Sequence, residues 1–254
     1  MKRRLLLLVL LVALLPATGA RAAELQQVVG TLESPFRAGA SQQAAIRDFQ
    51  ADFAQESTIA SLDRSQKGAG TVAMRFVRTG SAQPALVQFR WDYREPNRQV
   101  IVSDGKTMWV YVPENQQVVV SDLAAAQQSG NNNPLTFLSG LGDLGRDFNI
   151  AFADPARDAE GSWVLELTPR RPSALIVRLL IAVDDRAVAA FIRGGTTGGI
   201  LPLRASTVFD PAGNRTHIAF SHVRLNQGLG DKDFRFTPPA GVEVLHADGQ
   251  KMGY

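Results

Sequence analysis

The feature that most constrains the fold is a run of short alternating segments between Phe89 and Val120. In its first segment three aromatic residues, Phe89, Trp91 and Tyr93, alternate with polar residues. A period of two places alternate side chains on one face of a β-strand, so these aromatic residues share a face. Turn residues at 95–97, 104–105 and 113–115 separate this strand from three more at 99–103, 107–112 and 117–121. The pattern predicts an antiparallel meander with one face rich in large aromatic residues.

Similar short segments lie on both sides of this meander. We expect further strands at 48–59, 70–77, 149–152, 162–168, 176–183, 187–193, 202–209, 217–224 and 234–236. We expect a sheet of about eleven strands, at short and regular spacing. The chain lacks the alternation of strands with long helical segments that a parallel sheet requires. We therefore expect a mainly β protein built on an antiparallel sheet, with helical structure within 23–46 and at 123–128.

The N-terminal residues 1–22 have the features of a secretory signal peptide. Basic residues at positions 2–4 precede an apolar run at 5–15, and Ala20-Arg21-Ala22 matches a cleavage site with small residues. The apolar run is shorter than the roughly 20 residues that a membrane span needs. We expect cleavage near Ala22, a single domain over 23–244, and a polar, disordered tail over 245–254.

Charge and cysteine content exclude several classes of function. The chain has 27 Lys and Arg residues against 24 Asp and Glu, and the signal segment holds four of the basic residues and no acidic one. The mature chain therefore has a net charge near −1, which does not favour nucleic-acid binding. The chain contains no cysteine, so it has no disulfide, and Ala23 stands where a bacterial lipoprotein would carry its lipid-modified cysteine.

Residues with the chemistry of an active site are scarce. The three histidines, at positions 217, 222 and 246, come without cysteine or any metal-ligand spacing, so we expect no metal site. No serine stands in a G-x-S-x-G elbow, and the glycine-rich stretch 194–199 lacks the Lys-Ser/Thr ending of a phosphate loop. We expect no catalytic residues, no cofactor and no enzymatic activity.

The aromatic residues have two interpretations, a packed barrel core or an apolar binding pocket. The apolar stretch 134–144 favours the pocket because Gly140 and Gly142 make it a poor core helix and suit a movable cover. The expected cavity residues are Phe49, Phe53, Phe89, Trp91, Tyr93, Trp109 and Tyr111. The expected lid residues are Pro134, Leu135, Phe137, Leu138 and Leu141.

Several motifs, in order, resemble those of the periplasmic outer-membrane lipoprotein carrier family, LolA. They are F-R-W-x-Y at 89–93, S-D-G-K-T at 103–107, W-x-Y-x-P at 109–113, the P-L-T-F-L segment at 134–138, and F-x-F-x-P-P-x-G-V at 234–242. The resemblance implies an unclosed antiparallel β-barrel with helices as a lid over an apolar cavity. It also implies an arginine that contacts the lid, for which Arg78 is the first choice and Arg75 the second.

The resemblance further implies the function and the partners. Such a carrier binds the acyl chains of lipoproteins released by an inner-membrane ABC transporter and delivers them to an outer-membrane acceptor. We expect a periplasmic monomer that acts as a lipoprotein chaperone. Two alternatives remain open: a lipid- or lipoprotein-sensing or transfer protein of the same fold, and a hydrolase of envelope lipids, for which the sequence shows no nucleophile and base.

Overall fold

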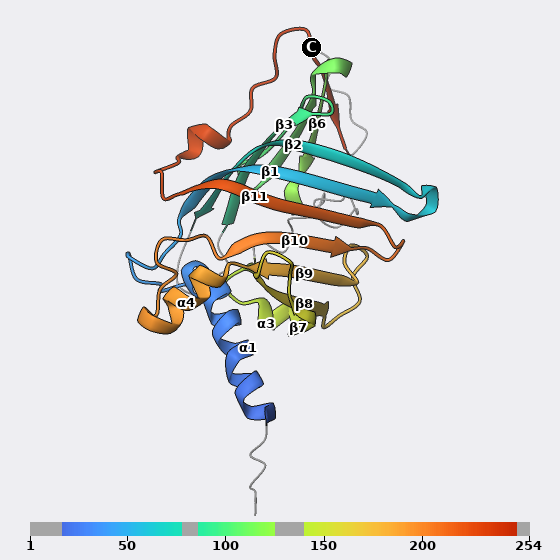
Figure 1. The fold of residues 1–254 in the computed structure, drawn as a ribbon. Coiled ribbons are helices and arrows are strands. Elements are labelled where there is room, and N and C mark those ends of the chain that lie inside the picture. The colour runs from blue at the N-terminus through green and yellow to red at the C-terminus, as the bar shows by residue number, and fades with distance from the viewer. Residues whose placement is uncertain (1–16, 78–85, 125–139, 248–254) are drawn as a thin grey trace, which may run out of the picture.

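The computed structural model describes residues 17–77, 86–124 and 140–247, with side chains described from Glu24 onward. Its centre is a sheet of twelve strands in the order β12-β6-β5-β4-β3-β2-β1-β11-β10-β9-β8-β7 (Figure 1). All neighbouring strands pair antiparallel except β12 and β6, which are parallel. The expected mainly β, unclosed antiparallel sheet is therefore confirmed.

The strands follow the predicted segments closely in most places. Their bounds are β1 Asp48–Ile59, β2 Arg64–Val77, β3 Leu86–Glu95, β4 Gln99–Ser103, β5 Thr107–Val112, β6 Gln117–Asp122, β7 Phe148–Arg157, β8 Trp163–Pro169, β9 Arg178–Val183, β10 Leu203–Phe209, β11 Arg215–Leu225 and β12 Glu243–His246. The helices are α1 Ala17–Glu33, α3 Leu144–Asp147 and α4 Asp185–Gly194, with 3-10 turns η1 Ser34–Phe36, η2 Ala60–Leu62, η3 Pro113–Asn115 and η5 Asp231–Phe234.

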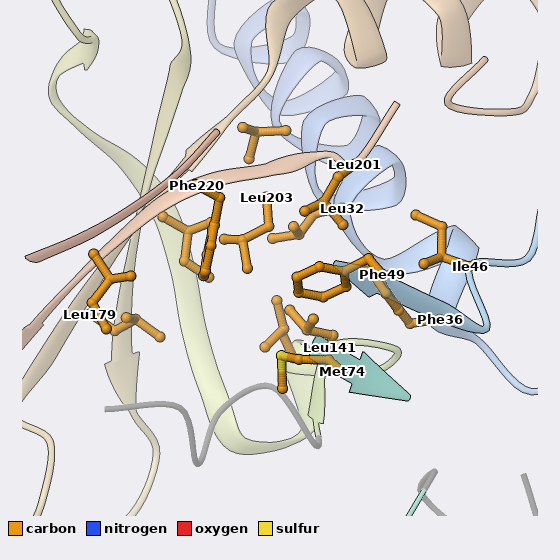
Figure 2. Packing of buried hydrophobic residues seen from close by; sticks show 14 of the residues in the cluster. Leu32, Phe36, Ile46, Phe49, Met74, Leu141, Leu179, Leu201, Leu203 and Phe220 are labelled. Atoms are coloured by element: carbon orange, nitrogen blue, oxygen red, sulfur yellow. The ribbon is translucent and has the colours of Figure 1, made fainter. Parts of the chain in front are cut away.

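The main core lies on the concave face of this sheet. In β2, buried Val72, Met74 and Phe76 alternate with half-buried neighbours, which is the period expected of a strand with one covered face. The cover comes from helical segments, because Val28 and Leu32 of α1 and Val188 of α4 belong to the same hydrophobic cluster. Figure 2 shows residues of this cluster converging from α1, the strands and the segment before α3.

The segment 187–193, which we expected to be a strand, is helix α4, so that prediction is wrong. The side chain of Asp184 caps the helix by accepting hydrogen bonds from the amides of Arg186 and Ala187. Gly195, at φ +70°, ends it in the left-handed conformation that glycine adopts without strain. Burial alone would raise the pKa of Asp184, but hydrogen bonds from Arg186 and the capping amides outweigh it and hold this pKa below its usual range.

A C-terminal strap, residues 226–247, leaves β11 and runs over the convex face of the sheet to pair with β6 (Figure 1). It begins at the buried Asp48, whose carboxylate accepts hydrogen bonds from the amides of Gln227 at 2.6 Å and Gly228 at 3.1 Å. The expected strand at 234–236 is wrong, because Phe234 ends η5 instead. The strap ends in β12, which reaches His246 and so enters the segment expected to be a tail.

The N-terminal helix α1 begins at Ala17, within the expected signal segment. Within the described residues, none of the helices combines the length and the apolar character that crossing a membrane would require.

Candidate functional site

An aromatic cluster lies on the concave face at the centre of the sheet. Phe53 of β1 contacts Trp91 and Tyr93 of β3 edge-on, with ring centroids 4.6 and 4.8 Å apart. Phe220 of β11 extends the cluster, with its ring 6.2 Å from Trp91 and 6.0 Å from Phe49. Strand pairing brings these residues together, because Phe53 lies opposite Phe220 across the β1–β11 ladder.

Five of the seven residues predicted to line the cavity share this face. Phe49, Phe53, Phe89 and Trp91 are at most 5% exposed, and Tyr93 is half-buried. Leu32 of α1 and Leu141 belong, with these aromatic residues, to the main hydrophobic core cluster, and both are labelled in Figure 2. The described part of the concave face is thus a packed apolar layer under helical segments, and its role as the lining of a cavity stays a prediction.

Trp109 and Tyr111 lie on the opposite, convex face, so their placement in the cavity is wrong. In the antiparallel pairs Trp91 faces Ile101, and Ile101 faces Val110. Paired residues share a face, so on β5 the even-numbered positions are concave and the odd-numbered ones convex. Tyr111 packs instead on Phe236 of the C-terminal strap, with ring centroids 5.6 Å apart.

Tyr93 is the polar member of the concave cluster. Its hydroxyl donates a 2.8 Å hydrogen bond to Oε1 of Gln55, and its ring packs on Phe53. Burial raises the pKa of Tyr93 from 10.0 to about 12, because the phenolate would lose its hydration inside an apolar layer. The cluster therefore keeps this hydroxyl neutral above pH 10, where a tyrosine in water would already ionise.

We expect Tyr93 to ionise only at about pH 12 in the folded protein. Because the folded-state pKa is raised, the stability that it contributes is full below about pH 10 and is lost as the pH rises towards 12. The check is an ultraviolet absorbance titration of phenolate in the wild type and in Tyr93→Phe, which retains the other two of the chain's three tyrosines. An unchanged high-pH step in Tyr93→Phe would contradict the assignment.

Residues 140–144 are the described part of the stretch 134–144, which we expected to form the lid. Leu141 and Leu144 are each 1% exposed and belong to the core cluster. Gly142 lies so close to η1 that an added Cβ would stand 2.8 Å from the carbonyl oxygen of Phe36. At this position glycine therefore permits a close backbone approach. The other predicted lid residues, Pro134, Leu135, Phe137 and Leu138, lie outside the described residues.

Glu33, which the sequence analysis did not single out, ties this segment to α1. Its side chain is buried, and Oε1 accepts a 2.8 Å hydrogen bond from the amide of Leu144. The other oxygen, Oε2, pairs with the guanidinium of Arg37 one turn further along. A Glu at the end of the helix, followed by Arg four residues later, is the signal from which this pair could have been found.

Replacing Glu33 by alanine is expected to cost about 1–3 kcal/mol, because the buried Leu144 amide would lose its acceptor. Urea unfolding and the exchange rate of the Leu144 amide measure the effect. Glu24→Ala provides the control, since Glu24 is an exposed carboxylate on the same helix. Equal losses in the two variants would contradict the anchoring role of Glu33.

Arg75, the second choice for a lid-contacting arginine, lies on the convex face between Met74 and Phe76. Its guanidinium donates to Oε1 of Gln88 and to Asp231 of the C-terminal strap. The hydrogen bond from Arg75, together with one from Gln88, holds the pKa of Asp231 below its usual range. Arg75 therefore fastens the strap, and Arg78 lies outside the described residues.

Two hollows lined by described residues are polar or of mixed character. One, of about 750 Å³, lies on the convex side and is lined by residues 50–52, 71–73, 90, 92, 94, 222, 224, 232 and 233. The other, of about 620 Å³, lies near α3 and the end of β8 and is lined by residues 146–148, 169–173 and 176. Among the described His, Asp and Glu residues, no group of three is placed to hold a metal ion.

The chain is similar to known proteins over most of its length. Residues 44–237 match the family model described as outer membrane lipoprotein carrier protein LolA. Proteins named outer-membrane lipoprotein carrier protein are 34% identical in Nitrosospira multiformis and 31% identical in Dechloromonas aromatica. The first alignment covers 78% of this chain and 82% of the relative, and the second covers 78% and 81%.

Solved structures show weaker similarity. A LolA superfamily protein from Nitrosomonas europaea aligns over 85% of this chain and 97% of its own, at 13% identity and a TM-score of 0.38. A DUF1329 family protein from Desulfovibrio piger aligns over 85% and 97%, at 12% identity and a TM-score of 0.45. The family assignment rests on the family match and the relatives above, which agree with the concave sheet under helices: the chain belongs to the LolA family of outer membrane lipoprotein carrier proteins.

Proposed function

We propose that this protein is a periplasmic chaperone that shields the acyl chains of lipoproteins between the inner and the outer membrane. The observation that carries the proposal is a concave apolar face, rich in aromatic residues and covered by helical segments, in a chain of the LolA family. The partners in this proposal are an inner-membrane ABC transporter that loads the carrier and an outer-membrane acceptor that unloads it. The proposal includes no covalent chemistry.

The energetics of the cargo explain why such a protein needs a large apolar face. Burying one CH₂ group is worth about 0.8 kcal/mol, so roughly forty groups in the acyl chains of a lipoprotein amount to roughly 30 kcal/mol. Free lipoprotein therefore does not cross an aqueous compartment, and the carrier must exchange its own apolar contacts for contacts with the chains. Helices α1 and α4 contribute side chains to the core cluster and belong to none of the strand ladders, which suits this exchange because no ladder has to break when they move.

In the proposed mechanism, the segment with Pro134, Leu135, Phe137, Leu138 and Leu141 acts as the lid, and Arg78 contacts it. Support comes from the segment's described end, where Leu141 packs in the concave core and Glu33 holds Leu144. This anchor would serve as the fixed end of a moving cover.

The test compares two adjacent residues of β4 that face opposite sides of the sheet. Ile101 is concave and Val100 convex, and both are half-buried, so either position can accept a charge with less risk to folding than the buried aromatics. We expect Ile101→Glu to lose the ability to take lipoproteins from inner-membrane vesicles into the soluble fraction, and Val100→Glu to retain it. Equal activity in the two variants, both folded by circular dichroism, would contradict the assignment of the concave face.

A further inference from the structure

The hollow of about 620 Å³ opens at one end of the sheet. Phe148 begins β7, Pro169 ends β8, and Ile176 stands just before β9, so the hollow occupies the space at the end of these three strands. Its full lining consists of Arg146, Asp147, Phe148, Pro169, Arg170, Arg171, Pro172, Ser173 and Ile176. Nothing in the proposed carrier function accounts for this combination of side chains.

One part of the lining is apolar and continuous with the core. Phe148 and Ile176 are 9% and 7% exposed, and both belong to the main hydrophobic cluster of the concave face. Pro169 and Pro172 add apolar surface without a backbone N–H donor. An alkyl chain that lies on this floor would remain in contact with the same core that the proposed carrier uses.

The rest of the lining is basic. Three arginines, Arg146, Arg170 and Arg171, stand against one carboxylate, Asp147. Arg146 pairs with that carboxylate through Nη2 at 2.6 Å and Nε at 3.1 Å, and the pair holds the pKa of Asp147 below its usual range. Two positive charges, those of Arg170 and Arg171, therefore remain without an opposite charge in the lining.

Within the described residues, these two arginines have few hydrogen-bond partners. Arg170 uses Nε for a 2.9 Å hydrogen bond to the carbonyl oxygen of Gly145, and its terminal nitrogens have no partner among the residues that the structure describes. Arg171 has no hydrogen-bond or ion-pair partner among the residues that the structure describes, although its charge is near enough to Asp147 to help lower that pKa. The backbone of Arg170 is held as well, because its amide donates a 2.9 Å hydrogen bond to the carbonyl oxygen of Asp147.

We propose that this hollow binds an anionic amphiphile, with the phosphate or carboxylate head on Arg170 and Arg171 and the alkyl chain on Phe148 and Ile176. Guanidinium groups match such heads because they donate two parallel hydrogen bonds to the oxygens of one anion. The proposal deepens the proposed carrier function and rests on it: it adds that cargo with a negative charge beside its alkyl chains is preferred over neutral cargo of the same chain length.

The test is isothermal titration calorimetry of the purified protein with three probes, each below its micelle concentration. Dodecyl phosphate has both the anionic head and the alkyl chain. Dodecyl maltoside has the same chain with a neutral head, and inorganic phosphate is the anion alone. We expect the wild type to bind dodecyl phosphate about tenfold more tightly than dodecyl maltoside, a ratio that corresponds to about 1.4 kcal/mol. Added salt should reduce this ratio, because the arginines that face the head are exposed.

The matched variants are Arg171→Glu and Arg193→Glu. Arg193 is an exposed arginine in the last turn of α4, outside the lining, and neither residue has a hydrogen bond or ion pair within the described part of the chain. Arg171→Glu should abolish the preference for dodecyl phosphate and leave dodecyl maltoside binding unchanged, while Arg193→Glu should keep both. Arg170→Gln/Arg171→Gln should give the same loss as Arg171→Glu without introducing a negative charge.

Each other outcome contradicts a distinct statement. Equal binding of the two dodecyl probes by the wild type, or equal preference in Arg171→Glu and Arg193→Glu, overturns the anionic site and leaves the carrier function standing. Inorganic phosphate that binds as tightly as dodecyl phosphate shows a site for free anions and overturns the amphiphile assignment. If neither dodecyl probe binds, the result contradicts the carrier function and, with it, the anionic site.

Discussion

Replacing Trp91 by alanine is expected to lower the free energy of unfolding by about 3–5 kcal/mol, the range found for large aromatic residues in protein cores. Trp91 is 2% exposed and contacts Phe53 and Phe220, so its removal leaves a cavity at the centre of the concave cluster. Urea unfolding followed by circular dichroism measures the change.

The chain offers a matched control on the other side of the sheet. Trp109 is half-buried on the convex face, so Trp109→Ala should cost clearly less than Trp91→Ala. Trp91→Phe should also cost less, since it retains an aromatic ring and removes an indole N–H that has no hydrogen-bond partner among the described residues. Losses of equal size at positions 91 and 109 would contradict the assignment of the two faces.

A glutamate at position 91 would bury a carboxylate and unfold the protein, which makes it unsuitable as a test of lipid binding.

Replacing Phe234 by alanine is expected to release the C-terminal strap. Phe234 is fully buried at the end of η5, which packs against β3, and it lies outside the main core cluster. Val102 and Val118, which point to the convex face, are also fully buried and outside that cluster, so the strap closes a second, smaller apolar layer. A buried phenylalanine contributes about 3–5 kcal/mol, most of which should appear here as local opening of the strap.

Hydrogen exchange detected by mass spectrometry measures this opening. Amides of β12 and of residues 227–234 should exchange at least about 100-fold faster in Phe234→Ala, since every 1.4 kcal/mol corresponds to a factor of about ten. The amides of β8 and β9, at the other end of the sheet, should be unchanged. Phe209→Ala, at a half-buried phenylalanine of β10 that stacks with Arg178, should leave the strap protected. Uniform acceleration over the whole sheet in Phe234→Ala would show global unfolding and contradict a separate strap layer.

Alternation within single strands predicted much of the fold and part of the site. The period of two in β1 and β3 correctly placed Phe49, Phe53, Phe89, Trp91 and Tyr93 on one face, because the apolar face of a strand is visible in its own sequence. Which positions of the next strand lie on the same side of the sheet depends on the number of residues in the turn between the two strands. The hairpin between β4 and β5 pairs Ser103 with Met108, so an odd-numbered position lies opposite an even-numbered one and Trp109 turns to the convex side.

Other elements could not be predicted because their signals are local caps or distant contacts. In α4 the short apolar run 187–193 was expected to be a strand, but the Asp184 cap and the glycine at 195 mark a helix and could have been recognised. The parallel strand β12 pairs with β6 through residues 126 positions apart, such as Glu243 and Gln117. No pattern within residues 243–246 shows that they belong to a sheet, because their partner strand decides it.

The C-terminal strap also sets the order in which this protein can be completed. Its residues are synthesised after those of the other eleven strands and, in a secreted chain, they cross the membrane after them. Until they arrive, the convex residues Val102, Tyr111 and Val118 have no cover, whereas the concave core already has its helices and the eleven preceding strands. Any step that delays or truncates the C-terminus therefore leaves an apolar surface and the open edge of β6 exposed to other chains.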